Sequence, residues 1–113
     1  FFLLGWFDGS YDFGRSYAKL LHCVDKEQGY GGTNGSAYCN PELDKIHKKG
    51  TQTVDPEKRA EILRTLNEKA MNEVAVIPLH YQRDLYAVTE GRGIDFTPRS
   101  DTWIVFKDMA IGG

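Results

Sequence analysis

Residues 55–74 read DPEKRAEILRTLNEKAMNEV, and this stretch carries the strongest local signal in the chain. Asp55 can accept hydrogen bonds from the free N–H groups of a helix start, and Pro56 at the first helical position sacrifices no intrahelical bond. Apolar residues then recur at steps of three and four, which places them on one helix face. These residues are Ile62, Leu63, Leu66, Ala70, Met71 and Val74. We therefore predict an amphipathic helix from Pro56 to about Val74.

The same start signal occurs once more upstream, at Asn40-Pro41. We predict a short helix there, with Leu43 and Ile46 as its apolar stripe and Gly50 as its stop. A further helix is expected near residues 14–22, where three apolar residues share a face at spacings i, i+3 and i+4. These are Tyr17, Leu20 and Leu21.

A loop is predicted between the first two helices, because four glycines fall within residues 25–36. Cys23 and Cys39 bracket this loop. In an exported protein the two cysteines would form one disulfide, worth about 3 kcal/mol, whereas in a cytosolic protein they would be free thiols or metal ligands.

A buried strand is expected at residues 1–7, a short apolar run that ends in turn chemistry, and further strands are expected at residues 85–88 and 103–106. Residues 76–79 are expected to be extended. Pro78 ends any helix and favours extended backbone before it. Together with the helices, these runs predict a mixed α/β fold over residues 1–113. The first residue is Phe1 rather than a methionine, and it lies inside an apolar block. We therefore expect an excised piece whose upstream part is missing. The alternative is a mature domain trimmed at this point.

Composition excludes several classes of partner. At 113 residues the chain suffices for one domain, and its formal net charge of −2 offers no basic field for nucleic acid. The longest apolar run, residues 1–7, is too short to span a bilayer.

Metal and cofactor sites are not predicted. A zinc site usually uses closely spaced pairs of Cys or His ligands, and His22, His47 and His80 form no such pair with each other or with the cysteines. His47 is expected on the solvated side of its helix. The glycine-rich loop is not followed by the Lys-Ser or Lys-Thr of a phosphate-binding loop.

The order of these signals resembles the C-terminal segment of the peptide/nickel class of extracellular solute-binding proteins, the dipeptide- and oligopeptide-binding-like components of ABC importers. The resemblance covers most of the chain. It rests on Gly5-Trp6, then Leu20-Leu21-His22-Cys23, then Tyr38-Cys39-Asn40-Pro41-Glu42-Leu43-Asp44, then Thr53-Val54-Asp55-Pro56-Glu57-Lys58-Arg59, and finally Ala75-Val76-Ile77-Pro78-Leu79-His80-Tyr81.

This resemblance implies one lobe of a two-lobed fold of the periplasmic-binding-protein type II kind, with no catalytic residues. A peptide or similar small solute would be held between two closing lobes and delivered to membrane permease subunits. The resemblance also implies a Cys23–Cys39 disulfide and a periplasmic or extracellular, membrane-anchored location. The cut face of such a fragment would expose an apolar patch and promote self-association.

The resemblance further implies ligand-binding roles for Trp6, Asp8 and Tyr81. In the family a Gly-Trp-x-x-Asp loop lines the cleft, and its Asp pairs with the amino group of a bound peptide. Here Asp8 follows Trp6 by two positions instead of three, and Asp12 matches the second acidic position of that loop. The alternatives are that Trp6 is core, that Asp8 and Asp12 are turn and cap residues, and that Tyr81 packs in a strand.

Two other classes of function remain open. A small cysteine hydrolase would need Cys23 or Cys39 as a free thiolate beside a histidine base. A self-contained protein-interaction domain would stay monomeric and bind one partner. Thiol titration distinguishes the hydrolase, and the association state distinguishes the interaction domain.

Overall fold

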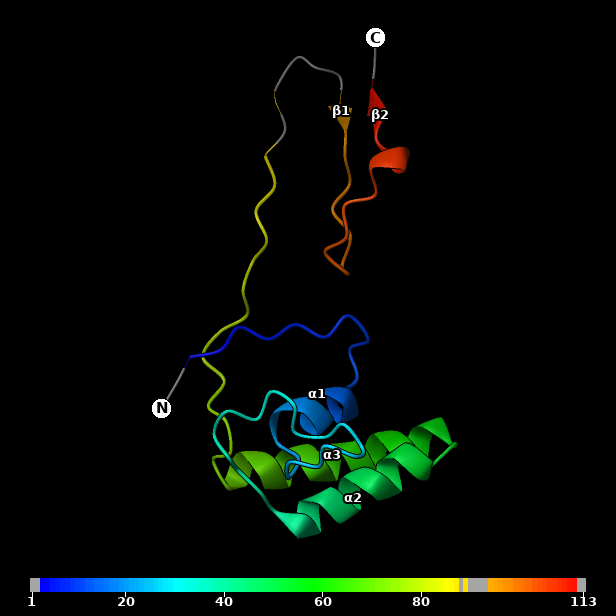
Figure 1. Ribbon diagram of the computed structural model, residues 1–113. Coiled ribbons are helices and arrows are strands. Elements are labelled where there is room, and N and C mark those ends of the chain that lie inside the picture. Colours follow the sequence, from blue (N-terminus) through cyan, green and yellow to red (C-terminus); the bar gives the residue numbers. More distant parts are fainter. Residues whose placement is uncertain (1–2, 88, 90–93, 112–113) are drawn as a thin grey trace. The chain divides into compact units, whose positions relative to one another are not determined.

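The computed structural model describes residues 3–87, 89 and 94–111 (Figure 1). The chain divides into two compact units, residues 1–78 and 79–113, each considered by itself below. The first unit contains helices α1 (Phe13–Leu20), α2 (Pro41–Gln52) and α3 (Pro56–Asn72). The second contains strands β1 (Ile94–Asp95) and β2 (Ala110–Ile111) with a 3₁₀ turn, η1 (Phe106–Asp108).

Two of the helix starts are those expected from the sequence. The Asn40 side chain accepts hydrogen bonds from the N–H groups of Glu42 and Leu43, and the Asp55 side chain accepts from those of Glu57 and Lys58. Each cap thus satisfies two donors that the helix itself leaves unpaired. The predicted capping roles of Asn40 and Asp55 are confirmed.

The core of the first unit lies among its three helices. Figure 1 shows α2 and α3 side by side in opposite directions, with α1 packed beside them. The buried apolar residues are Tyr17, Leu21, Leu43, Leu63, Leu66 and Ala70. All six belong to the apolar stripes predicted for the helices. Val74 does not join its predicted stripe, because α3 ends at Asn72 and the Val74 side chain is exposed.

Gly50 does not stop α2, contrary to the prediction. The helix continues to Gln52, and Gly50 is buried inside it. A β-carbon at this position would lie 3.2 Å from Cδ2 of Leu63. The missing side chain therefore allows α2 and α3 to approach each other closely, and packing outweighs the low helix propensity of glycine.

The predicted strands do not form in the described parts of their ranges. Residues 3–7, 85–87 and 103–106 are assigned to no strand, and residues 3–7 are exposed rather than buried. Residues 1, 2 and 88 lie outside the described residues. The two-residue antiparallel pair of β1 and β2, with Ile94 opposite Ile111, is the sheet of the described chain. A strand acquires its hydrogen bonds only from a neighbouring strand, and these segments have none here. Of the predicted mixed α/β fold, the described residues therefore show the helices but not the predicted strands.

Candidate functional site

The candidate site begins at the turn that precedes α1. The carbonyl oxygen of Asp8 accepts a hydrogen bond from the N–H of Tyr11 at 3.0 Å. Oδ1 of Asp8 accepts two further bonds from Ser10, from its N–H at 2.9 Å and its hydroxyl at 2.6 Å. The two Ser10 bonds, followed by the nearby Arg15 guanidinium, hold the pKa of Asp8 below its usual value, so the carboxylate is ionised at neutral pH.

Trp6 is fixed next to this turn by a bond to α1. Its Nε1 donates to Oγ of Ser16 at 3.0 Å. The indole nevertheless remains 41% exposed, so one part of the ring is anchored while another is available to solvent. Trp6 is therefore not part of the buried core of the first unit, which was one of the alternatives from the sequence.

Trp6 and Asp8 line the same hollow, whose volume is about 610 Å³. Its walls come from the segment before α1, from one face of α1 and from the glycine-rich loop. The lining residues are Trp6, Phe7, Asp8, Gly9, Arg15, Ala18, Lys19, Gly32 and Thr33. The structure thus brings together two of the three residues predicted to bind a ligand.

The hollow carries both signs of charge. Nε of Arg15 lies 3.8 Å from Oδ2 of Asp8, and the Arg15 side chain is largely exposed. Lys19, one helical turn further along α1, donates to the carbonyl oxygen of Gly29 at 3.3 Å. An aromatic wall with one carboxylate and two cations suits a small ligand that carries both an ammonium and an anionic group.

Sequence reasoning missed Arg15 and Lys19. They are four positions apart and therefore share a face of α1. That spacing was the available signal, but only the fold places the face against the Trp6 segment.

Asp12 serves as the cap of α1 and does not line the hollow. Its Oδ1 accepts from the N–H of Gly14 at 2.8 Å, and its Oδ2 lies 2.6 Å from Nη2 of Arg59 on α3. The alternative prediction that Asp12 is a helix-capping residue is thereby confirmed. Arg59 pairs with this distant residue rather than with Asp55, its neighbour four positions earlier in the sequence.

The glycine-rich loop is closed by a disulfide between Cys23 and Cys39, so neither cysteine is a free thiol. Besides the bond from Lys19 to Gly29, three hydrogen bonds attach the loop to α1. The N–H of Gly31 donates to the carbonyl oxygen of Ala18 at 2.8 Å, while the N–H and hydroxyl of Thr33 donate to that of Lys19 at 3.1 and 3.0 Å. These bonds hold the loop wall of the hollow in place.

Gly31 is expected to be the loop position least tolerant of a side chain. Its φ is +67°, and an added β-carbon would lie 2.8 Å from the carbonyl oxygen of His22 and 2.9 Å from Cα of Val24. We predict that Gly31→Ala lowers the free energy of unfolding by at least about 2 kcal/mol, from left-handed strain plus a backbone clash. Urea unfolding measures this loss.

Two neighbouring glycines are matched controls for that change. Gly29 also has a positive φ, of +71°, but nothing lies within 4 Å of its missing β-carbon, so Gly29→Ala should cost only about 1 kcal/mol. Gly32 has neither a positive φ nor an atom within 4 Å of its missing β-carbon. Equal losses for Gly31→Ala and Gly32→Ala would contradict the clash argument.

His47 is not solvated, contrary to the prediction. It is 1% exposed, and it packs against the rings of Tyr17, His22 and Tyr30. The local sequence of α2 is polar around His47, and burial arises because α1 and the glycine-rich loop cover this face. Among the described residues no cluster of His, Cys, Asp or Glu side chains is arranged to hold a metal ion.

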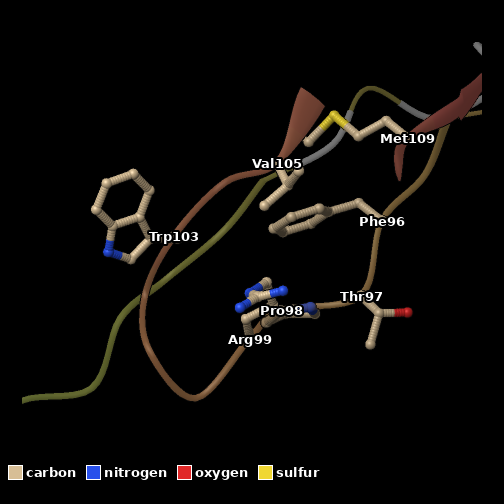
Figure 2. A pocket seen from close by; sticks show the side chains of 7 residues that line it. All are labelled: Phe96, Thr97, Pro98, Arg99, Trp103, Val105 and Met109. Atoms are coloured by element: carbon tan, nitrogen blue, oxygen red, sulfur yellow. The ribbon is translucent and has the colours of Figure 1, made fainter. Parts of the chain in front are cut away.

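Tyr81, the third predicted ligand residue, belongs to the second unit, and its side chain is fully exposed. That unit has its own hollow of about 260 Å³. Figure 2 shows the side chains of Phe96, Val105 and Met109 close together on one side of it. Arg99, which also lines it, is paired with the Asp101 carboxylate and holds its pKa at about 2.

Comparisons with protein-family descriptions, curated proteins and solved structures find no significant match to this chain. Within the described ranges, none of the helices combines the length and apolar composition required to cross a bilayer. The disulfide is compatible with an oxidising compartment.

Proposed function

We propose that this chain is part of the solute-binding component of an ABC importer, capturing peptides or a similar small solute outside the cytoplasmic membrane and passing it to permease subunits. The observation that carries the proposal is the joint presence of Trp6 and Asp8 in one hollow. These are the residues to which the family resemblance assigns the aromatic wall and the amine anchor.

The charges in the hollow support a zwitterionic ligand. Asp8 uses Oδ1 for Ser10, while its Oδ2 has Arg15 as a neighbour at 3.8 Å, beyond hydrogen-bond range. A ligand ammonium would find its counter-charge at Oδ2, and a ligand carboxylate would find one at Arg15 or Lys19. Free peptides and amino acids carry both groups.

Apolar segments without strand partners in the described chain support the proposal that further polypeptide completes the binding site. Large apolar side chains are exposed in the segments that precede and follow the three helices in the sequence. They include Leu3, Leu4, Phe7, Val76, Ile77 and Leu79. Segments of this composition are typical of sheet strands, and we propose that their sheet partners belong to the rest of a two-lobed receptor.

Asp8→Asn is expected to weaken peptide binding by the complete receptor about 10- to 100-fold, because it removes a charge-assisted hydrogen bond to the ligand amine. Calorimetry with short peptides measures the dissociation constant. Asp25→Asn is the matched control, since Asp25 lies in the same unit but does not line the hollow. An unchanged affinity in Asp8→Asn would remove Asp8 from the site. Full affinity in residues 1–113 alone would contradict a site completed by a second lobe.

The exposed apolar segments also favour a second candidate, a self-contained protein-interaction domain. Sedimentation of the purified chain separates the two proposals. A receptor fragment should self-associate through these segments, whereas an interaction domain should stay monomeric until it meets its partner.

A further inference from the structure

A pair of histidines, His22 and His47, lies buried between α1, α2 and the glycine-rich loop. They are 3% and 1% exposed, and their ring centres are 5.4 Å apart. Tyr30 of the loop stacks on His22 at 4.2 Å and covers this histidine pair from the loop side. Tyr17 of α1 lies 5.3 Å from His47 on another side. The histidine pair therefore reaches solvent only if the loop moves.

Hydrogen bonding leaves one buried nitrogen on each ring without an acceptor among the described residues. Nδ1 of His22 lies 2.8 Å from the carbonyl oxygen of Cys23, so this nitrogen carries the proton. Nε2 of His22 and Nδ1 of His47 are buried and have no hydrogen-bond partner among the described residues. A second proton on His47 would make its Nδ1 a buried donor without an acceptor, on a ring that carries a positive charge. Such a donor is costly to bury.

The charged groups around His47 do not compensate for that cost. The titratable groups that face it come from α1, from α2 and from the loop; they are Tyr17, Asp12, Asp44, His22 and Tyr30.

The two carboxylates in this set are already engaged. Asp12 is paired with Arg59 of α3 at 2.6 Å, and Oδ1 of Asp44 accepts the Tyr17 hydroxyl at 2.9 Å. Oδ2 of Asp44 accepts the N–H of Cys23 at 3.3 Å and lies 3.5 Å from His22. Burial and then His22 lower the pKa of His47, with partial opposition from the backbone of Gly14 and from the two carboxylates.

Few hydrogen bonds attach residues 24–33, the part of the loop that covers the histidine pair, to the rest of the first unit. Asp25 and Tyr30 exchange two backbone hydrogen bonds, and Gly31 and Thr33 donate to α1 as described above. The Cys23–Cys39 disulfide ties the two ends of the loop together. Asn34 donates to the carbonyl oxygen of His22 at 3.0 Å and Tyr38 donates to Glu73 at 2.5 Å, so these two residues anchor the end of the loop. Residues 24–33 can therefore lift and return while these anchors and the disulfide stay in place.

We propose that the histidine pair is an acid-sensitive latch, in which protonation of His47 releases residues 24–33 from α1 and deprotonation closes them again. His47 takes up a proton more readily in the open loop than in the closed one. The closed form is therefore fully favoured above about pH 6.5, the ordinary value for histidine, and loses its advantage as the pH falls below that value. Gly32 and Thr33 also line the hollow, so release of the loop at acid pH would open one wall of the ligand site. This effect on ligand binding rests on the proposed function, whereas the latch itself does not.

Hydrogen exchange of the Gly31 and Thr33 amides tests the latch on the full oxidised chain, without any ligand. Protection factors, corrected for the intrinsic pH dependence of exchange, should fall between pH 7.5 and pH 5.5, by up to about tenfold, because the lower pH is about one unit below the ordinary histidine value. Amides of residues 63–70 in α3 are the internal reference and should keep their protection. Equal protection of the loop at both pH values, or an equal loss in α3, would overturn the latch.

A substitution at His47 identifies the titrating group. In His47→Gln this fall in protection should disappear, whereas His80→Gln, which alters an exposed histidine of the second unit, should retain it. An undiminished fall in a folded His47→Gln chain would contradict the proposal. If that variant does not fold, the pH profile of the unaltered chain against its α3 reference still decides the question.

Discussion

Leu66→Ala is expected to lower the free energy of unfolding of the helical unit by about 3 to 4 kcal/mol. Leu66 is 0% exposed and lies in the core cluster formed by all three helices. Truncation removes the transfer free energy of the lost methyl and methylene groups and leaves a cavity, and such changes cost 2 to 5 kcal/mol in buried positions. In a unit of this size the loss should shift the urea midpoint strongly.

Val54→Ala is the control for this change. Val54 joins α2 to α3 and is 94% exposed, so its truncation should alter stability by about 0.5 kcal/mol or less. Similar losses in the two variants would mean that the three helices do not enclose a common core. A loss confined to Leu66→Ala places the stability of residues 3–78 in the contacts among α1, α2 and α3.

Removal of the disulfide is expected to cost about 3 kcal/mol. Cys23 and Cys39 are 16 positions apart, and a cross-link that closes a loop of this length restricts the unfolded chain by about that amount. Reduction also frees the loop that carries Tyr30 and Thr33, so the covering of the histidine pair should weaken as well. The measurement compares urea unfolding of the oxidised and reduced chains.

The double variant Cys23→Ser/Cys39→Ser separates the loss of the bond from any effect of the reducing agent. Its stability should match that of the reduced chain, and reductant should not change it further. The same urea midpoint for the oxidised and reduced chains would refute the prediction. It would imply that contacts with α1, such as the bonds from Gly31 and Thr33, already hold the loop without the cross-link.

The helices could be predicted because their signals are local. Asn40 and Asp55 cap donors only two and three positions ahead, and the apolar stripes recur within a single turn. The candidate site was predictable only in part. Trp6 and Asp8 were recognised from a resemblance, whereas Arg15 and Lys19 join them only once α1 is packed beside the Trp6 segment.

His47 and Gly50 show where local reasoning failed within a correctly predicted helix. Both lie on α2 among polar neighbours, and both are buried because other segments return to cover them. His47 is covered by Tyr17, His22 and Tyr30, which precede it by 17 to 30 positions. No spacing rule within a helix reports such a contact.

The sequence by itself determined where helices begin and which of their faces are apolar, since a helix forms its hydrogen bonds and side-chain pairs within one segment. It also marked residues 3–7 and 76–79 as apolar and suited to extended backbone. Only the tertiary structure decided that these segments have no strand partner in the described chain and that two histidines are buried. The reason is physical: strand pairing and burial are both relations between distant segments, and their free energy appears only when those segments meet.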